Sequence, residues 1–98
     1  MELSFEGEVC EWRGPAPFHF VTVPDDAADA IADVASLVTY GWGMIPVTLT
    51  VGDTTVTTSL WPKDGAYVVP IKKRVQDAER VAIGDRIEVR LTLEVRAP

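Results

Sequence analysis

The sequence has very few of the side chains on which common enzyme mechanisms depend. Cys10 is the only cysteine and His19 the only histidine of 98 residues. A zinc site needs several such ligands at close spacing, and a hydrolytic triad needs a base beside its nucleophile. The serines, Ser4, Ser36 and Ser59, lie outside any Gly-x-Ser-x-Gly elbow. We therefore expect no catalytic residues, no metal and no cofactor.

Glycine-rich phosphate loops are missing as well. The segment 41–43, Gly-Trp-Gly, lacks the third glycine and the preceding strand of a dinucleotide-binding fingerprint, and no Walker loop occurs. Fifteen acidic residues offer carboxylate pairs by chance, and no pair is marked out as an acid and a base. The sequence thus predicts a protein that is not an enzyme.

Long apolar runs and a signal peptide are also absent. No apolar stretch approaches the ~20 residues that a bilayer requires. The first six residues contain neither a basic region nor an apolar one. A lone cysteine cannot form an intramolecular disulfide, and the nearby Glu8 and Glu11 disfavour a reactive thiolate at Cys10. These features predict a cytoplasmic protein that does not bind membranes.

Positive charge is scarce and unevenly distributed. Nine Lys and Arg stand against 15 Asp and Glu, which gives a net charge of −6. Residues 1–49 hold eight acids and one base, whereas residues 50–98 hold seven acids and eight bases. The deficit of cations disfavours general nucleic-acid binding, because affinity for phosphates comes from Lys and Arg. Either the two halves fold against each other, or the C-terminal half forms a partly basic face.

The residues that are present alternate as they do in strands with one buried face. The length suits one domain, and we expect residues 1–98 to form a single β-barrel domain. Alternation of apolar and polar residues predicts strands over 3–10, 18–23, 44–51, 54–61, 66–69 and 86–96. About six such strands must stack as a sandwich or close on themselves. A mainly β fold is expected, a small closed barrel with two short helices.

Two segments repeat their apolar residues at helical spacing. The first begins at Pro24-Asp25-Asp26, where proline and acids suit a helix start, and ends in the segment 40–43. Its apolar face consists of Ala27, Ile31, Val34 and Val38. The second begins at Pro70 and runs for about two turns, with Ile71, Val75 and Ala78 on one face.

The dipeptide Gly52-Asp53 predicts a two-residue hairpin turn. That turn sets a register in which Val51 faces Thr54, Leu49 faces Val56, Val47 faces Thr58 and Ile45 faces Leu60. The other face pairs Thr50 with Thr55, Thr48 with Thr57 and Pro46 with Ser59. Because proline cannot donate to a ladder, Pro46 belongs at an edge or at a strand start.

Short motifs in a fixed order make the chain similar to a bacterial family of uncharacterised domains. They are Phe5-Glu6-Gly7, Val23-Pro24, Thr58-Ser59-Leu60, Pro70-Ile71-Lys72-Lys73 and Gly84-Asp85, and the likeness covers about residues 3–93. Members of that family occur alone or fused ahead of domains similar to bacteriocin-protection proteins. The resemblance implies a double-split β-barrel of AbrB-like fold and no particular activity. AbrB-type domains bind DNA as dimers through basic surfaces, and the net charge of −6 departs from that pattern.

The second predicted helix carries its charges in the reverse of the usual order. Its first turn holds Lys72, Lys73 and Arg74, and its last turn holds Asp77 and Glu79. Each misplaced charge costs about 0.3–1 kcal/mol against the helix dipole. Free backbone N–H groups at a helix start bind anions, so we predict an anion-binding patch that Lys63 also joins. The alternative is that these cations are solvated or pair with the acidic N-terminal half.

The aromatic side chains in or beside connections form a second candidate site. They are Trp12, Tyr40, Trp42 and Trp61. Such residues either line a pocket or an interface, or they plug the ends of a small barrel. Trp42, between two glycines, and the neighbouring Tyr40 are the ones we expect at a binding site.

Taken together, these features favour a non-enzymatic binding module for a small anionic ligand or an acidic segment of a partner. Its site would comprise Lys63, Lys72, Lys73, Arg74, Tyr40 and Trp42. The alternative is a structural domain that works by self-association as a homodimer. DNA binding by analogy with AbrB is the least favoured function.

Overall fold

A computed structural model describes residues 1–14, 18–38, 44–63 and 65–93 of the chain, with the side chains of 34–38 left aside. This part contains seven strands and two helices. In chain order they are β1 (Glu2–Glu8), β2 (Cys10–Trp12), β3 (Phe18–Thr22), α1 (Asp25–Val38), β4 (Ile45–Val51), β5 (Thr54–Lys63), β6 (Ala66–Ile71), α2 (Lys73–Glu79) and β7 (Arg86–Thr92). The expectation of a mainly β fold with two short helices is confirmed.

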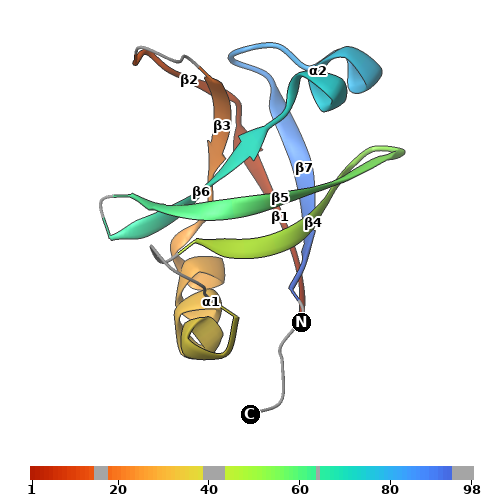
Figure 1. Cartoon of the computed structure of the whole chain (residues 1–98). Coiled ribbons are helices and arrows are strands. Elements are labelled where there is room, and N and C mark those ends of the chain that lie inside the picture. The colour runs from red at the N-terminus through yellow and green to blue at the C-terminus, as the bar shows by residue number, and fades with distance from the viewer. Residues whose placement is uncertain (15–17, 39–43, 64, 94–98) are drawn as a thin grey trace.

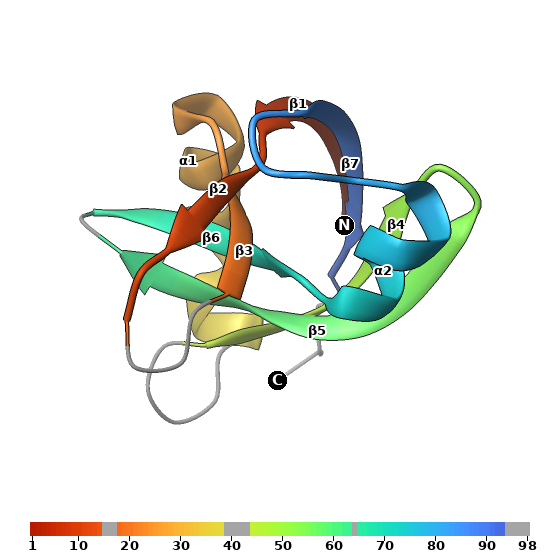
Figure 2. The same ribbon diagram turned by 90° about the horizontal axis from the view of Figure 1, so that it is seen from above.

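The strands form one antiparallel sheet in the order β1-β7-β4-β5-β6-β3-β2. The sheet curls into a half-barrel, with β5 on the opposite side from β1 and β7 (Figure 2). Helix α1 lies below the curled sheet and α2 lies beside it at the far end (Figure 1). Closure into a double-split barrel stays a prediction.

The predicted first strand is divided at Val9 into β1 and β2, which is why the structure has seven strands where about six were expected. The Val9 amide donates to the Asp85 carbonyl at 2.8 Å, and the Val9 carbonyl accepts from the Gly84 amide at 2.8 Å. Val9 therefore uses its backbone to hold the turn before β7. β1 pairs with β7 on one side of this point, and β2 pairs with β3 on the other.

The core lies on the inner face of the curl and follows the predicted alternation. Its fully buried members include Val21, Ile45, Leu49 and Leu91. The expected alternation of the last strand is confirmed in β7, where Val89 and Leu91 are buried, and Leu93, directly after β7, is buried as well. The buried residues Ile31 and Ala28 of α1 and Val75 of α2 join the same cluster. No helix in the described ranges is long and apolar enough to cross a membrane.

The predicted hairpin register between β4 and β5 is confirmed at every position. Gly52 has a φ of +57°, the left-handed conformation that glycine adopts without a Cβ clash. Thr50 and Thr55 share a hydroxyl–hydroxyl hydrogen bond of 3.0 Å on the outer face. Pro46 is the second residue of β4, close to the strand start as expected.

The predicted helix start at Pro70 is wrong. Pro70 and Ile71 end β6, where Pro70 pairs with Phe20 of β3. Helix α2 begins at Lys73, after an extended Lys72 with φ −63° and ψ 151°. The fixed φ of proline suits an extended strand as well as a first helical turn, so the residue type did not distinguish the two. Ala78, expected on the apolar face of this helix, is exposed.

The position of Glu79 over the hairpin turn yields a first prediction. A Cβ at Gly52 would overlap the Glu79 carboxylate, which accepts a 2.6 Å hydrogen bond from the Thr54 hydroxyl. Gly65 is a matched control, because its φ is +79° and nothing lies within 4 Å of an added Cβ. Gly65→Ala should cost about 1–2 kcal/mol of left-handed strain. Gly52→Ala should cost about 1 kcal/mol more, since it also displaces Glu79.

Urea unfolding of both variants measures this difference. Equal losses of unfolding free energy would contradict a structural bond between α2 and the hairpin.

Candidate functional site

Aromatic rings gather on the outer face of the sheet where β2, β3 and β5 meet. Side chains alternate along a strand, so Phe18 and Phe20 point away from the core residue Val21. The Phe18 ring centroid lies 5.3 Å from that of Trp61, 6.2 Å from that of Trp12 and 5.9 Å from that of Phe20. Phe18 is thus the hub of an aromatic cluster, defined as Trp12, Phe18, Phe20 and Trp61.

Trp12 is not the loop residue that its Gly/Pro-rich surroundings suggested. It ends β2 and pairs with Phe18 of β3. Trp12 and Trp61 each remain 42% exposed. These two tryptophans therefore do not plug the ends of a barrel. They present ring surface to solvent, as residues of a binding face do.

Lys63, the last residue of β5, lies over the aromatic cluster. Its Nζ is 4.5 Å from the centroid of the Trp12 ring and 4.8 Å from that of Phe20. A cation over a ring face at an exposed site is worth about 0.5–1 kcal/mol. The contact holds the Lys63 ammonium against the exposed Trp12 ring and the buried Phe20 ring.

A shallow groove of about 510 Å³ opens on the same outer face. Its lining consists of Met44, Pro46, Thr57, Thr58, Ser59, Trp61, Pro70 and Lys72, and we call it the Trp61–Lys72 groove. The groove follows from the pairing of β6, which pairs with β5 only over residues 66–68 and with β3 over residues 68–71. Where β6 departs, this edge of β5 has no strand partner among the described residues, and the groove lies beside it.

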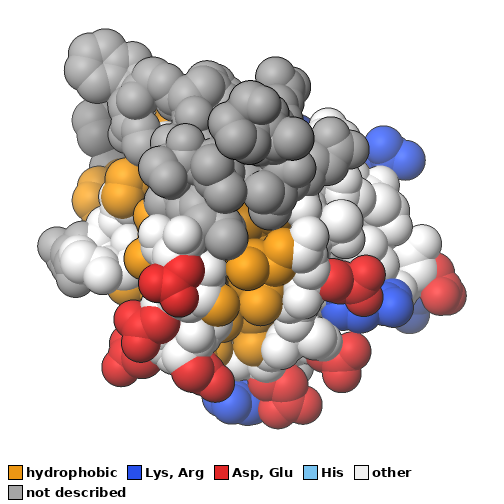
Figure 3. All heavy atoms as spheres, turned by 90° about the horizontal axis from the view of Figure 1, so that it is seen from below, with side chains coloured by type: hydrophobic (Ala, Val, Ile, Leu, Met, Phe, Trp, Pro, Cys, Tyr) orange, Lys and Arg blue, Asp and Glu red, His pale blue; other side chains and the backbone are white. Residues whose placement is uncertain are grey.

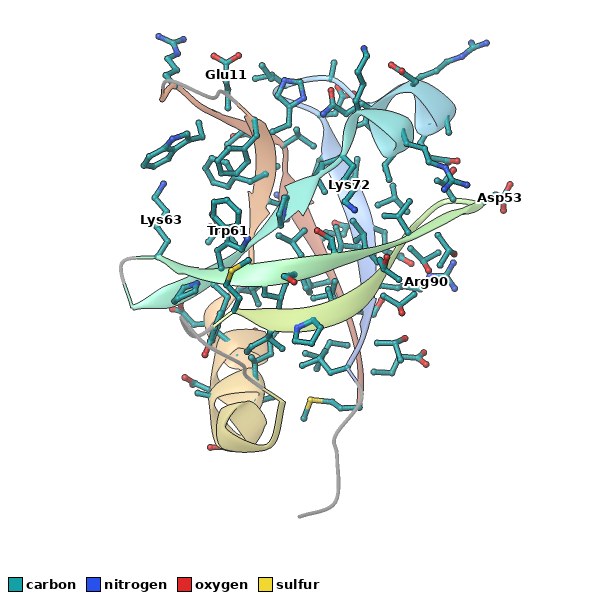
Figure 4. The ribbon with its side chains drawn as sticks, in the orientation of Figure 1. Glu11, Asp53, Trp61, Lys63, Lys72 and Arg90 are labelled. Carbon is teal, nitrogen blue, oxygen red and sulfur yellow. The ribbon has the colours of Figure 1, made fainter. Side chains whose placement is uncertain are left out.

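Lys72 crosses this groove. Its Nζ donates a 2.6 Å hydrogen bond to the Thr57 carbonyl of β5. The side chain is exposed, and its other N–H donors are available to a ligand. Figure 4 shows Trp61 between Lys63 and Lys72 along β5.

The predicted cation cluster is distributed over two surfaces. Lys72 lines the groove and Lys63 lies over the adjoining rings, whereas Lys73 pairs with Asp77 on α2 at 3.6 Å. Arg74, also on α2, is exposed and is not part of the groove lining. Tyr40 and Trp42 lie outside the described residues.

The reversed charges of α2 have structural partners. Lys72 bonds to Thr57, Lys73 pairs with Asp77, and Glu79 accepts the Thr54 hydroxyl. Two of these contacts fasten the short helix to β5. The unusual charge order therefore does not by itself indicate an anion at the helix start, because Lys72, Lys73 and Glu79 have partners within the protein.

Phe18 and Phe20 are the residues of the aromatic cluster that were not predicted, whereas Trp12 and Trp61 were among the four aromatic candidates. The sequence pattern that indicates these residues is the alternation along β3, which puts Phe18 and Phe20 on the face opposite Val21. The same period places Trp61 on the face of Thr57 and Ser59 in β5. Strand alternation thus adds Phe18 and Phe20 to the candidates Trp12 and Trp61.

The acidic residues concentrate elsewhere on the molecule. Seen from below, Asp and Glu side chains surround a hydrophobic patch (Figure 3). Among the described residues that line the groove, Lys72 is the one that carries a charge. An acidic protein thus carries a local basic and aromatic face.

The comparison with protein families finds one match over most of the chain. The family described as a domain of unknown function, DUF1905, matches residues 5–91. This range contains every residue of the aromatic cluster and of the Trp61–Lys72 groove. No curated protein matches the chain.

The hub position of Phe18 yields a second prediction. Phe18→Ala removes the ring that contacts both Trp12 and Trp61, so iodide quenching of tryptophan fluorescence should increase. Because Phe18 is only half-buried, we expect a loss of about 1–3 kcal/mol in unfolding free energy. Thr22→Ala, at an exposed position of the same strand, is the control. Unchanged quenching in Phe18→Ala would show that Phe18 does not hold the tryptophans.

Proposed function

The chain belongs to the family DUF1905, and because that family has no known function, we propose one from the geometry: the domain is a non-enzymatic binding module. Its ligand occupies the Trp61–Lys72 groove. The ligand carries an apolar part that packs on Trp61 and an anionic group that pairs with Lys72.

The observation that carries this proposal is the presence of one exposed indole and one cation in a single groove. Ligand sites combine mostly apolar walls with a few polar groups and typically measure about 300–1,000 Å³. The groove meets this description, because Trp61, Met44, Pro46 and Pro70 supply apolar surface beside the Lys72 ammonium. An anion at Lys72 would add a charge-assisted hydrogen bond to the one that Lys72 makes with Thr57.

Binding is better supported than catalysis. Within the described part of the chain, Lys72 is the only side chain of the groove lining that carries an acid or a base. General acid–base catalysis needs a positioned proton donor or acceptor with a suitable pKa, and most mechanisms use two such groups. The groove offers recognition of charge and shape without that machinery.

The ligand carries few negative charges. The net charge of −6 repels polyanions at long range, and one groove cation compensates one anionic group. A small anion or an acidic segment of a partner meets this condition. Self-association and AbrB-like DNA binding stay predictions from the sequence.

A matched pair of probes tests the proposed function. N-acetyl-phenylalanine has a ring and a carboxylate, and N-acetyl-phenylalanine amide has the same ring without the charge. In ¹⁵N-resolved NMR titrations, the carboxylate should shift the Trp61 indole signal and bind about fivefold more tightly than the amide. Lys72→Gln should abolish this preference, because it removes the groove cation.

Lys73→Gln is the matched control, since it loses the same charge from the neighbouring residue outside the groove. Equal affinity of the wild-type domain for both probes, or no shift at Trp61, would refute the groove as an anion site.

A further inference from the structure

We propose that the occupant of this face is an extended acidic segment of a partner protein, which runs along β5 from Lys72 to Lys63. This inference rests on the proposed function, because the segment uses the Trp61–Lys72 groove. It extends that function by adding Lys63 and the aromatic cluster as a second contact region.

The spacing of the two cations argues for an extended chain. Lys72 touches β5 at Thr57, and Lys63 lies six positions further along the same strand. At about 3.3 Å per residue, these positions are about 20 Å apart. A small anion reaches one cation only, whereas an extended peptide of about six or seven residues spans both.

A chain of ring contacts lies between the two cations, beside the hydroxyl groups of Thr57, Thr58 and Ser59. Trp61 lines the groove and also contacts Phe18, whose ring stacks on Trp12. Lys63 lies directly over Trp12 at the far end. A bound segment would therefore place apolar side chains on the rings between its two acidic ends.

Neither cation is neutralised by a carboxylate among the described residues. Three other bases pair with acids: Arg13 with Glu11, Lys73 with Asp77 and Arg86 with Glu6. Lys72 instead bonds to a carbonyl, and Lys63 lies against rings. With respect to the described residues, both cations are thus open to a carboxylate of a partner, which is the charge complementarity that favours an acidic one.

A peptide fits this face better than a single-stranded nucleic acid does. A nucleic acid carries one phosphate per nucleotide, whereas the described residues in the middle of the face supply rings and no cation. A peptide with two acidic residues carries charge only where Lys72 and Lys63 lie. It also suffers less repulsion from the net charge of −6.

Two labelled heptapeptides of equal composition test the proposal. In DSLFLSD the aspartates are six positions apart, and in SLDDFLS they are adjacent. Fluorescence anisotropy should show that the full domain binds the first about tenfold more tightly than the second. Lys72→Glu and Lys63→Glu should each weaken binding of DSLFLSD by about tenfold or more.

Lys73→Glu and Arg74→Glu are the controls, because they change the net charge by the same amount from α2. They should weaken binding by less than about threefold, the effect of long-range charge alone. Urea unfolding of each variant confirms that it is folded.

The outcomes separate this inference from the proposed function. Loss of binding in Lys72→Glu but not in Lys63→Glu would overturn the extended segment and leave the groove as an anion site. Equal affinity for both peptides, no binding of either, or tighter binding of oligo-dT than of DSLFLSD would also overturn it. If, in addition, the wild-type domain shows no preference for N-acetyl-phenylalanine over N-acetyl-phenylalanine amide, both proposals are refuted.

Discussion

The pairing of β6 with two different strands is the constraint on which the candidate site depends. β6 begins beside β5 and ends beside β3, and Val68 is the residue where the two ladders meet. Pro70 follows, and because proline has no N–H it loses no donor when β6 leaves β5. The departure leaves that edge of β5 without a strand partner among the described residues. Lys72, at the end of β6, then reaches back to Thr57 and places a cation in the groove.

Much of the fold follows from short-range rules that the sequence displays. The hairpin register was predictable because a two-residue turn and a period of two leave one consistent pairing for 45–51 and 54–60. The end of β6 was not predictable, because the φ of Pro70 suits a strand and a helix start equally well. The break between β1 and β2 at Val9 was not predictable either. Val9 keeps the inward position that alternation gives it, and only its backbone departs, by bonding to the turn at 84–85.

The candidate site was predictable in part. Lys63 and Lys72 were both expected at a binding site, and they lie on the aromatic face. Their association with Trp12 and Trp61 arises from pairing between strands distant in sequence, which spacing along the chain does not show. Lys73 and Arg74 share the sequence signal of Lys72. Only the geometry of α2 against β5 distinguishes them, because Lys72 precedes the helix and points across the strand.

The specificity that we propose for this face rests on its electrostatic arrangement. The protein as a whole is acidic, yet Lys63 and Lys72, which pair with no carboxylate of the described residues, lie on either side of the aromatic cluster along β5. Distant polyanions are repelled, whereas a segment with two well-spaced carboxylates and apolar residues between them meets attraction at close range.

Intermolecular NOEs between the domain and DSLFLSD provide the most direct measurement. The account predicts NOEs from the central phenylalanine of the peptide to the Trp61 ring. NOEs confined to α1 or α2, with none to Trp61, would contradict it.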